Sequence, residues 1–115
     1  MAYRLAKGAL NNDNYRYVVH TTPNMQLVLM SLNPKEDIPL EVHEDTSQFF
    51  YIQKGTIDIK VGNEVYRLHS GDSIIVPPNT PHYVVNNSMD VVKLFTIYSP
   101  PEHNPDRIDV FKPSS

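Results

Sequence analysis

The chain has 115 residues, the usual length of one domain, so any functional site has to be built within a single core. Ten Lys and Arg against thirteen Asp and Glu give a net charge of −3, which argues against a nucleic-acid partner because no excess of basic residues is available to bind phosphates. The absence of cysteine excludes disulfide bonds, thiolate metal sites and a cysteine nucleophile.

Short runs in which apolar residues alternate with polar ones predict eight β-strands. Clusters of Pro, Gly, Asn and Asp separate the runs and predict turns. The ten prolines argue against long helices, and residues 3–10 are expected to form at most one or two helical turns. The expected strands are residues 15–20, 25–32, 48–54, 56–61, 64–68, 73–76, 82–86 and 91–98. So many strands in one small domain predict an all-β sandwich or barrel.

The pair Gly62 and Asn63 is the clearest hairpin signal, because both residue types tolerate a positive φ. The turn is expected to join the strands at residues 56–61 and 64–68 into an antiparallel hairpin. The pairing of these two strands can therefore be predicted from the sequence.

The strand at residues 48–54 is apolar on both faces. Alternation places Gln48, Phe50 and Ile52 on one face and Phe49 and Tyr51 on the other. One face has to pack against the opposite sheet, and the other has to be covered by the N-terminal segment or by a second copy of the chain. A homodimer that buries one outer face is a hypothesis that follows from this pattern.

Two polar clusters interrupt the apolar strands and carry the candidate chemistry. In the first, Glu41 and His43 are two residues apart and project to the same side of an extended chain, and a turn can return Gln48 beside them. In the second, a Pro-rich turn delivers His82 to the start of a strand, on the same face as Asn86. Each histidine taken alone would suit an interior or turn position, whereas a histidine and carboxylate gathered together suit a metal ion.

The two clusters resemble the paired motifs of the cupin superfamily. Gly55 matches the glycine that closes the first motif, and Asn79 stands where the second motif usually has glycine. The other matches to the second motif, at the expected spacing, are Gly71, Pro77, His82 and Asn86. The resemblance implies a double-stranded β-helix, a jelly-roll cupin barrel of two antiparallel sheets. Residues 40–43, 48–50 and 98–103 further resemble small single-domain cupins described as mannose-6-phosphate isomerase-like.

The resemblance also implies a ligand set for one divalent metal ion. Where the family usually has three His and one Glu, this chain has Glu41, His43, Gln48 and His82. Two imidazoles and one carboxylate suit Fe, Mn, Ni, Co or Zn. Gln48 would be a weak fourth ligand or would hold a bound water. A cupin pocket without metal is the alternative, because two of the four positions depart from the usual residues.

The implied function is that of a metal-dependent enzyme acting on a small organic molecule, of the oxygenase type or the isomerase/lyase type. Glu41 is the candidate catalytic base if it does not coordinate the metal. The side chains expected to contact substrate are Phe50, Ile52, Val84 and Leu94, together with His103 if the tail crosses the mouth of the barrel. A non-catalytic small-molecule-binding or sensing module is the alternative, and a protein whose main role is oligomer formation is a third possibility.

The expected organisation is a single domain over residues 1–115. It comprises an N-terminal strand segment at residues 1–24, a barrel core at about residues 25–98 and a Pro-rich C-terminal tail at residues 99–115. No apolar run has the length of a signal peptide or a membrane span, so we expect a cytoplasmic protein without a membrane partner.

Overall fold

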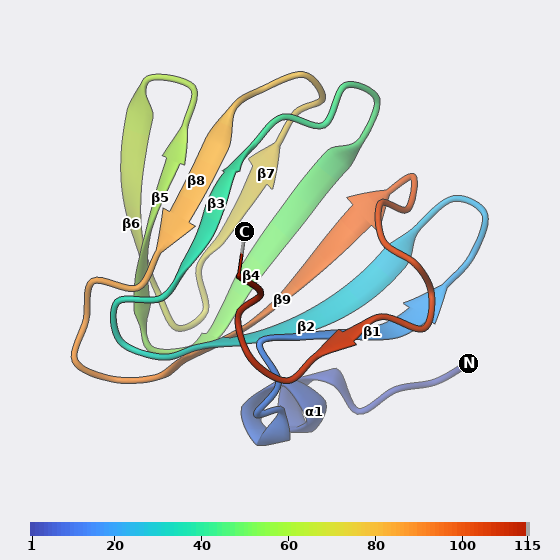
Figure 1. Ribbon diagram of the computed structural model, residues 1–115, viewed down its shortest axis with the longest axis horizontal. Helices are drawn as coiled ribbons and strands as arrows, with labels where there is room; N and C mark the ends of the chain where they lie inside the picture. The colour runs from blue at the N-terminus through green and yellow to red at the C-terminus, as the bar shows by residue number, and fades with distance from the viewer. Residues whose placement is uncertain (115) are drawn as a thin grey trace.

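In residues 1–114, which the computed structural model describes, ten strands form two antiparallel sheets and one short helix, α1 (Leu5–Asn11), precedes them (Figure 1). The six-stranded sheet has the order β10 (Ile108–Asp109), β1 (Arg16–Thr21), β2 (Gln26–Leu32), β9 (Val92–Ser99), β4 (Ser47–Lys54) and β7 (Ser73–Val76). The four-stranded sheet has the order β3 (Asp37–Glu41), β8 (His82–Val85), β5 (Thr56–Val61) and β6 (Glu64–His69). This architecture confirms the predicted all-β jelly-roll barrel.

All eight predicted strands are present, and their ends differ from the predicted ends by at most one residue. Two strands were not predicted. β3 contains Pro39, which weakens its strand signal, and its pairing with β8 is irregular between Ile38 and Glu41. β10 has only two residues and pairs with β1 at the edge of the large sheet. No helix in the described residues is long and apolar enough to span a membrane.

Positive φ values occur where the turn signals predicted them. Val61 pairs with Glu64 across the β5–β6 hairpin, and Gly62 has a φ of 59°, which confirms the predicted turn. Asn63 has no positive φ, so the left-handed conformation is needed only at the glycine. Asn79, at the position where the resembled motif usually has glycine, has a φ of 58°, which asparagine tolerates better than other residues with a side chain.

The main hydrophobic core lies between the two sheets. Phe50 and Ile52 of β4 face inward and are 1% exposed, and so are Ile57 and Ile59 of β5. Each such side chain contributes about 1.5–3 kcal/mol by leaving water. The alternation predicted for β4 is therefore confirmed, with Gln48 on the same buried face.

The N-terminal helix covers part of the outer face of the six-stranded sheet (Figure 1). Ala9 of α1 is fully buried and packs in one cluster with Leu29 of β2 and Phe95 of β9. The ring of Tyr51 stacks on that of Phe95 with their centroids 5.0 Å apart. The outer face of β4 is thus partly covered by the N-terminal segment, which is one of the two covers that its composition predicts.

Candidate metal centre

Three of the residues expected to bind metal come together at one end of the four-stranded sheet. Glu41 is the last residue of β3 and pairs with His82, the first residue of β8. His43 follows two residues after Glu41, where the chain leaves the sheet. One ligand atom from each of the three side chains lies within 4.8 Å of the other two. Strand pairing therefore joins the two polar clusters that are about forty residues apart in the sequence.

His82 is held in one orientation by the chain that precedes it. Its Nδ1 atom lies 3.0 Å from the carbonyl oxygen of Thr80, and the residue is 2% exposed. A carbonyl oxygen only accepts hydrogen bonds, so the contact assigns the ring proton to Nδ1. The Nε2 atom is then left with a free lone pair, which is the form of imidazole that binds a metal ion.

His43 lies between two carboxylates. Its Nε2 atom is 2.9 Å from Oε2 of Glu41, and its Nδ1 atom is 3.5 Å from Oε2 of Glu102. The contact with Glu41 has the distance of an ion pair without the direction of a hydrogen bond, so the buried Nε2 atom has no hydrogen-bond partner. Nitrogen and oxygen ligands lie about 2.0–2.2 Å from a bound metal ion, so the close approach of these two atoms is compatible with one shared ion.

Gln48 occupies a buried position on the inner face of β4. Its Nε2 atom donates a hydrogen bond to Oγ1 of Thr96 at 3.0 Å, while its Oε1 atom has no partner. The residue is 3% exposed and lies opposite Tyr98 in the pairing of β4 with β9. A buried amide oxygen without a partner is available to a water molecule or to a cation.

Aromatic rings surround the histidines. The ring of Tyr98 meets that of His43 edge to face with centroids 5.8 Å apart, and the ring of Phe50 lies 6.4 Å from that of His82. Burial raises the pKa of Tyr98, so its phenol stays protonated at neutral pH. Tyr98 lies on the same inward face of β9 as Leu94, and alternation alone does not indicate that it contacts the histidines.

The four apolar residues expected to line a substrate pocket all belong to the main core cluster. Each is 1% exposed or less, and the ring of Phe50 lies beside that of His82. They are Phe50, Ile52, Val84 and Leu94. Their contact with a substrate stays a prediction.

The C-terminal tail does reach the candidate centre. The Nε2 atom of His103 lies 3.1 Å from the hydroxyl of Tyr98, and Nη1 of Arg107 lies 3.1 Å from the Nδ1 atom of His103. An arginine only donates, so this contact needs an unprotonated Nδ1 atom. Burial of the ring, with Arg16, Arg107 and His43 nearby, lowers the pKa of His103 to about 4.

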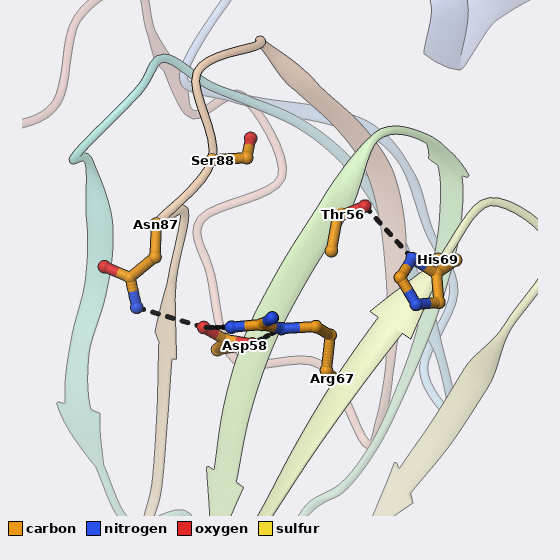
Figure 2. A pocket seen from close by; sticks show the side chains of 6 residues that line it. All are labelled: Thr56, Asp58, Arg67, His69, Asn87 and Ser88. Atoms are coloured by element: carbon orange, nitrogen blue, oxygen red, sulfur yellow. Dashed lines mark hydrogen bonds and ion pairs between the residues drawn. The ribbon is translucent and has the colours of Figure 1, made fainter.

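A separate polar depression of about 340 Å³ lies on the outer face of the four-stranded sheet (Figure 2). Arg67 donates to both carboxylate oxygens of Asp58, at 2.9 and 3.3 Å, and Asn87 donates to the same carboxylate at 3.0 Å. These donors lower the pKa of Asp58. Asp58 alternates along β5 with the inward Ile57 and Ile59, so the depression is on the side of the sheet away from His82. Its charges neutralise one another, and Glu41, His43 and His82 remain the candidate centre.

Known proteins match most of the chain. Residues 28–98 match the family model described as "Cupin domain". The chain is 46% identical over 110 residues to the uncharacterized protein L612 of Acanthamoeba polyphaga mimivirus, which covers 92% of this chain and 69% of that protein. It is 36% identical over 98 residues to the uncharacterized protein YrkC of Bacillus subtilis, covering 80% of this chain and 53% of YrkC, so it spans about half the length of that relative.

Two further similarities concern an enzyme and a solved structure. The chain is 35% identical over 57 residues to quercetin 2,3-dioxygenase of Bacillus subtilis, covering 50% of this chain and 17% of the enzyme. The crystal structure of BH2720 from Bacillus halodurans superposes with a TM-score of 0.93 at 26% identity, covering 96% of this chain and 88% of that chain.

Proposed function

The chain belongs to the cupin domain family, and on that premise we propose that Glu41, His43 and His82 bind one divalent metal ion at the centre of an enzyme for a small organic substrate. The observation that supports this proposal best is the Nε2 atom of His43. It is buried, faces the carboxylate of Glu41 at 2.9 Å and has no hydrogen-bond partner. A buried polar atom without a partner costs about 1–3 kcal/mol, and a cation between the two groups removes that cost.

The residues around the centre have different chemical roles. A divalent cation bound there would act as a Lewis acid toward a substrate oxygen, and an iron ion could also activate dioxygen. Thr80 keeps Nε2 of His82 free to bind, and Gln48 offers an amide oxygen as a weak fourth ligand or as a support for a water. Glu41 is the candidate general base in any state in which its carboxylate is not bound to the ion.

Two reaction types fit this donor set, an oxygenase-type reaction and an isomerase or lyase-type reaction. Both need open coordination positions, and three protein ligands leave such positions on the Fe, Mn, Ni, Co or Zn ion that these donors suit. The similarity to quercetin 2,3-dioxygenase over half of this chain supports the oxygenase type.

A non-catalytic small-molecule-binding or sensing module is the second candidate, and the departure of Glu41 and Gln48 from the family's usual ligand residues favours it. In either case the core residues Phe50, Ile52, Val84 and Leu94 expose 1% or less of their surface, so a small molecule has little access to them. A small molecule would instead approach past Glu41 and Glu102, whose side chains are 26% and 31% exposed.

Elemental analysis of protein purified without an affinity tag tests the metal proposal. Stoichiometric metal in the wild type and its loss in His82→Ala are the expected results. The metal-loaded protein is then assayed for oxygen consumption and for conversion of carbohydrate, β-diketone and phenolic compounds. Thermal stabilisation by one of these compounds without turnover would favour the binding module. A wild-type protein that neither contains nor takes up any of the five metals would rule out the proposal.

We also propose that the chain forms a homodimer through the outer face of the six-stranded sheet. Around α1 this face carries apolar side chains that are only partly buried: Leu27, Phe49, Tyr51 and Ile97. Burying them against a second copy would remove apolar surface from water. Light scattering at micromolar concentration is expected to give twice the chain mass, and a monomer alone would contradict the proposal.

A further inference from the structure

The carboxylate of Glu102 lies on the opposite side of the His43 ring from Glu41. Its Oε2 atom is 3.5 Å from Nδ1 of His43, whereas Oε2 of Glu41 is 2.9 Å from Nε2 of the same ring. Glu102 belongs to the C-terminal tail, nearly sixty residues after His43, and is not one of the three residues whose ligand atoms converge. It is thus placed to act on the ring and not directly on a metal ion.

The backbone of the tail is fixed at this point by a buried side chain. Gln26 of β2 is 0% exposed, and its amide group forms hydrogen bonds with two consecutive residues of the tail. Its Oε1 atom accepts from the backbone N–H of Glu102 at 3.3 Å and from that of His103 at 2.9 Å. Its Nε2 atom donates to the carbonyl oxygen of His103 at 2.7 Å. Because a buried amide is costly to leave without partners, these bonds hold the tail against the barrel.

The side chain of Glu102 is oriented by a second contact. Oγ1 of Thr46, which is 3% exposed, donates to Oε1 of Glu102 at 2.7 Å. One carboxylate oxygen is then occupied, and the other, Oε2, is the oxygen that faces the ring of His43. The direction of this carboxylate toward His43 therefore follows from a defined hydrogen bond.

We propose that Glu102 is a positioning residue of the metal centre: it accepts the Nδ1 proton of His43 and so keeps Nε2 as the metal-binding atom. The inference rests on the proposed metal site. A ring that carries its proton on Nδ1 has a lone pair on Nε2, next to the carboxylate of Glu41. A carboxylate on the far nitrogen of a metal-binding histidine also makes the ring a stronger donor. The C-terminal tail thereby becomes part of the centre.

The test measures cobalt(II) affinity by competition with a chelator, on the full chain. Glu102→Gln is expected to weaken binding by about 10- to 100-fold, the usual effect of losing such a partner. Glu44→Gln is the matched control, because it removes the same charge from an exposed side chain in the turn that follows His43, and its affinity should stay unchanged. Glutamine can still accept the hydrogen bond from Thr46, so Glu102→Gln should keep the fold, which circular dichroism checks.

A second readout separates positioning from a loss of charge or structure. Nitrogen–proton correlation spectra of the zinc-loaded protein show which ring nitrogen of His43 carries the proton. The wild type and Glu44→Gln should show the ring proton of His43 on Nδ1. In Glu102→Gln, the nitrogen–proton resonance of the His43 ring should shift. If the wild type binds cobalt but Glu102→Gln matches Glu44→Gln in both measurements, the role of Glu102 is overturned while the metal site stands. If the wild type binds no cobalt, the metal site itself falls, and the role of Glu102 with it.

Discussion

The side-chain nitrogen of Gln48 donates a hydrogen bond to the hydroxyl of Thr96 at 3.0 Å, and this contact fixes the direction of the amide group. Its Oε1 atom is consequently the end left without a partner in a position that is 3% exposed. An amide oxygen carries no formal charge and binds a divalent ion more weakly than an imidazole or a carboxylate. Gln48 and His82 should therefore differ in what they contribute to metal binding.

The substitution His82→Ala is expected to abolish tight metal binding, whereas Gln48→Ala should weaken it by about tenfold or less. The reason is that alanine at position 82 removes one of three strong donors, and alanine at position 48 removes a neutral one. Chelator competition measures both affinities. His69→Ala is the control, because His69 is exposed on the outer face of β6 beside Thr56 and should not affect the metal. Equal losses in His82→Ala and Gln48→Ala would show that Gln48 is a full ligand.

Most of the fold could be predicted because its signals are local. Alternation alone divides β4 into the inward Gln48, Phe50 and Ile52 and the outward Phe49 and Tyr51, and the structure has the same division. A strand such as β3 has no such signal, since Pro39 interrupts it and its pairing with β8 supplies what its own sequence lacks.

The candidate centre could be predicted only in part, because some of its residues lie in recognisable motifs and others are placed by contacts between residues far apart in the sequence. Glu41 and His43 are recognisable from their spacing, and His82 from its place in the second motif. The place of Glu102 depends on Gln26, 76 residues away, and no periodicity or spacing reports such a contact. Tail residues without an alternating pattern can therefore be located only once the tertiary structure is known.

Acid is expected to release the metal. Imidazole has to be neutral to bind a cation, and a free histidine has a pKa of about 6.5, so protons compete with the metal as the pH falls below about 6. Protein loaded at pH 7.5 is dialysed against metal-free buffer at a series of lower pH values, and its metal content is measured. Circular dichroism at each pH shows whether the fold is intact when the metal leaves. Full retention of metal down to pH 4 in folded protein would contradict a site of modest affinity that depends on two imidazoles.

The metal-free protein should lose stability between about pH 6.5 and pH 4 because of His103. Burial and the neighbouring Arg16 and Arg107 lower the pKa of His103 to about 4, below the value of about 6.5 in an unfolded chain. The unfolded state therefore binds the proton first, so the stabilising contribution is present above pH 6.5 and is lost as the pH falls toward 4. Urea unfolding at several pH values measures the loss.

The variant His103→Gln isolates this contribution, since glutamine has no titrating group and can still contact Tyr98 and Arg107. Its urea midpoint should depend less on pH between 6.5 and 4 than that of the wild type. The folded protein also lowers the pKa values of Asp37 and Asp58, which stabilise it above their unfolded pKa values. That stabilisation is lost at lower pH than that of His103, as the pH falls through the pKa values of the two carboxylates in the folded protein. If the urea midpoints of wild type and His103→Gln fell in parallel from pH 6.5 to 4, His103 would be excluded as the cause of the loss of stability.

Alanine should be tolerated worse at Gly55 than at Gly62, although both glycines have positive φ. A Cβ at Gly55, where φ is 97°, would lie 3.0 Å from Cγ2 of Val92 and 3.2 Å from the carbonyl oxygen of Val91, whereas a Cβ at Gly62 would have nothing within 4 Å. Gly62→Ala should cost about 1–2 kcal/mol from backbone strain alone. Gly55→Ala should cost about 2–4 kcal/mol, because packing strain adds to the backbone strain. Urea midpoints with an unchanged m-value give both numbers, and equal losses at the two positions would show that the neighbours of Gly55 move aside freely.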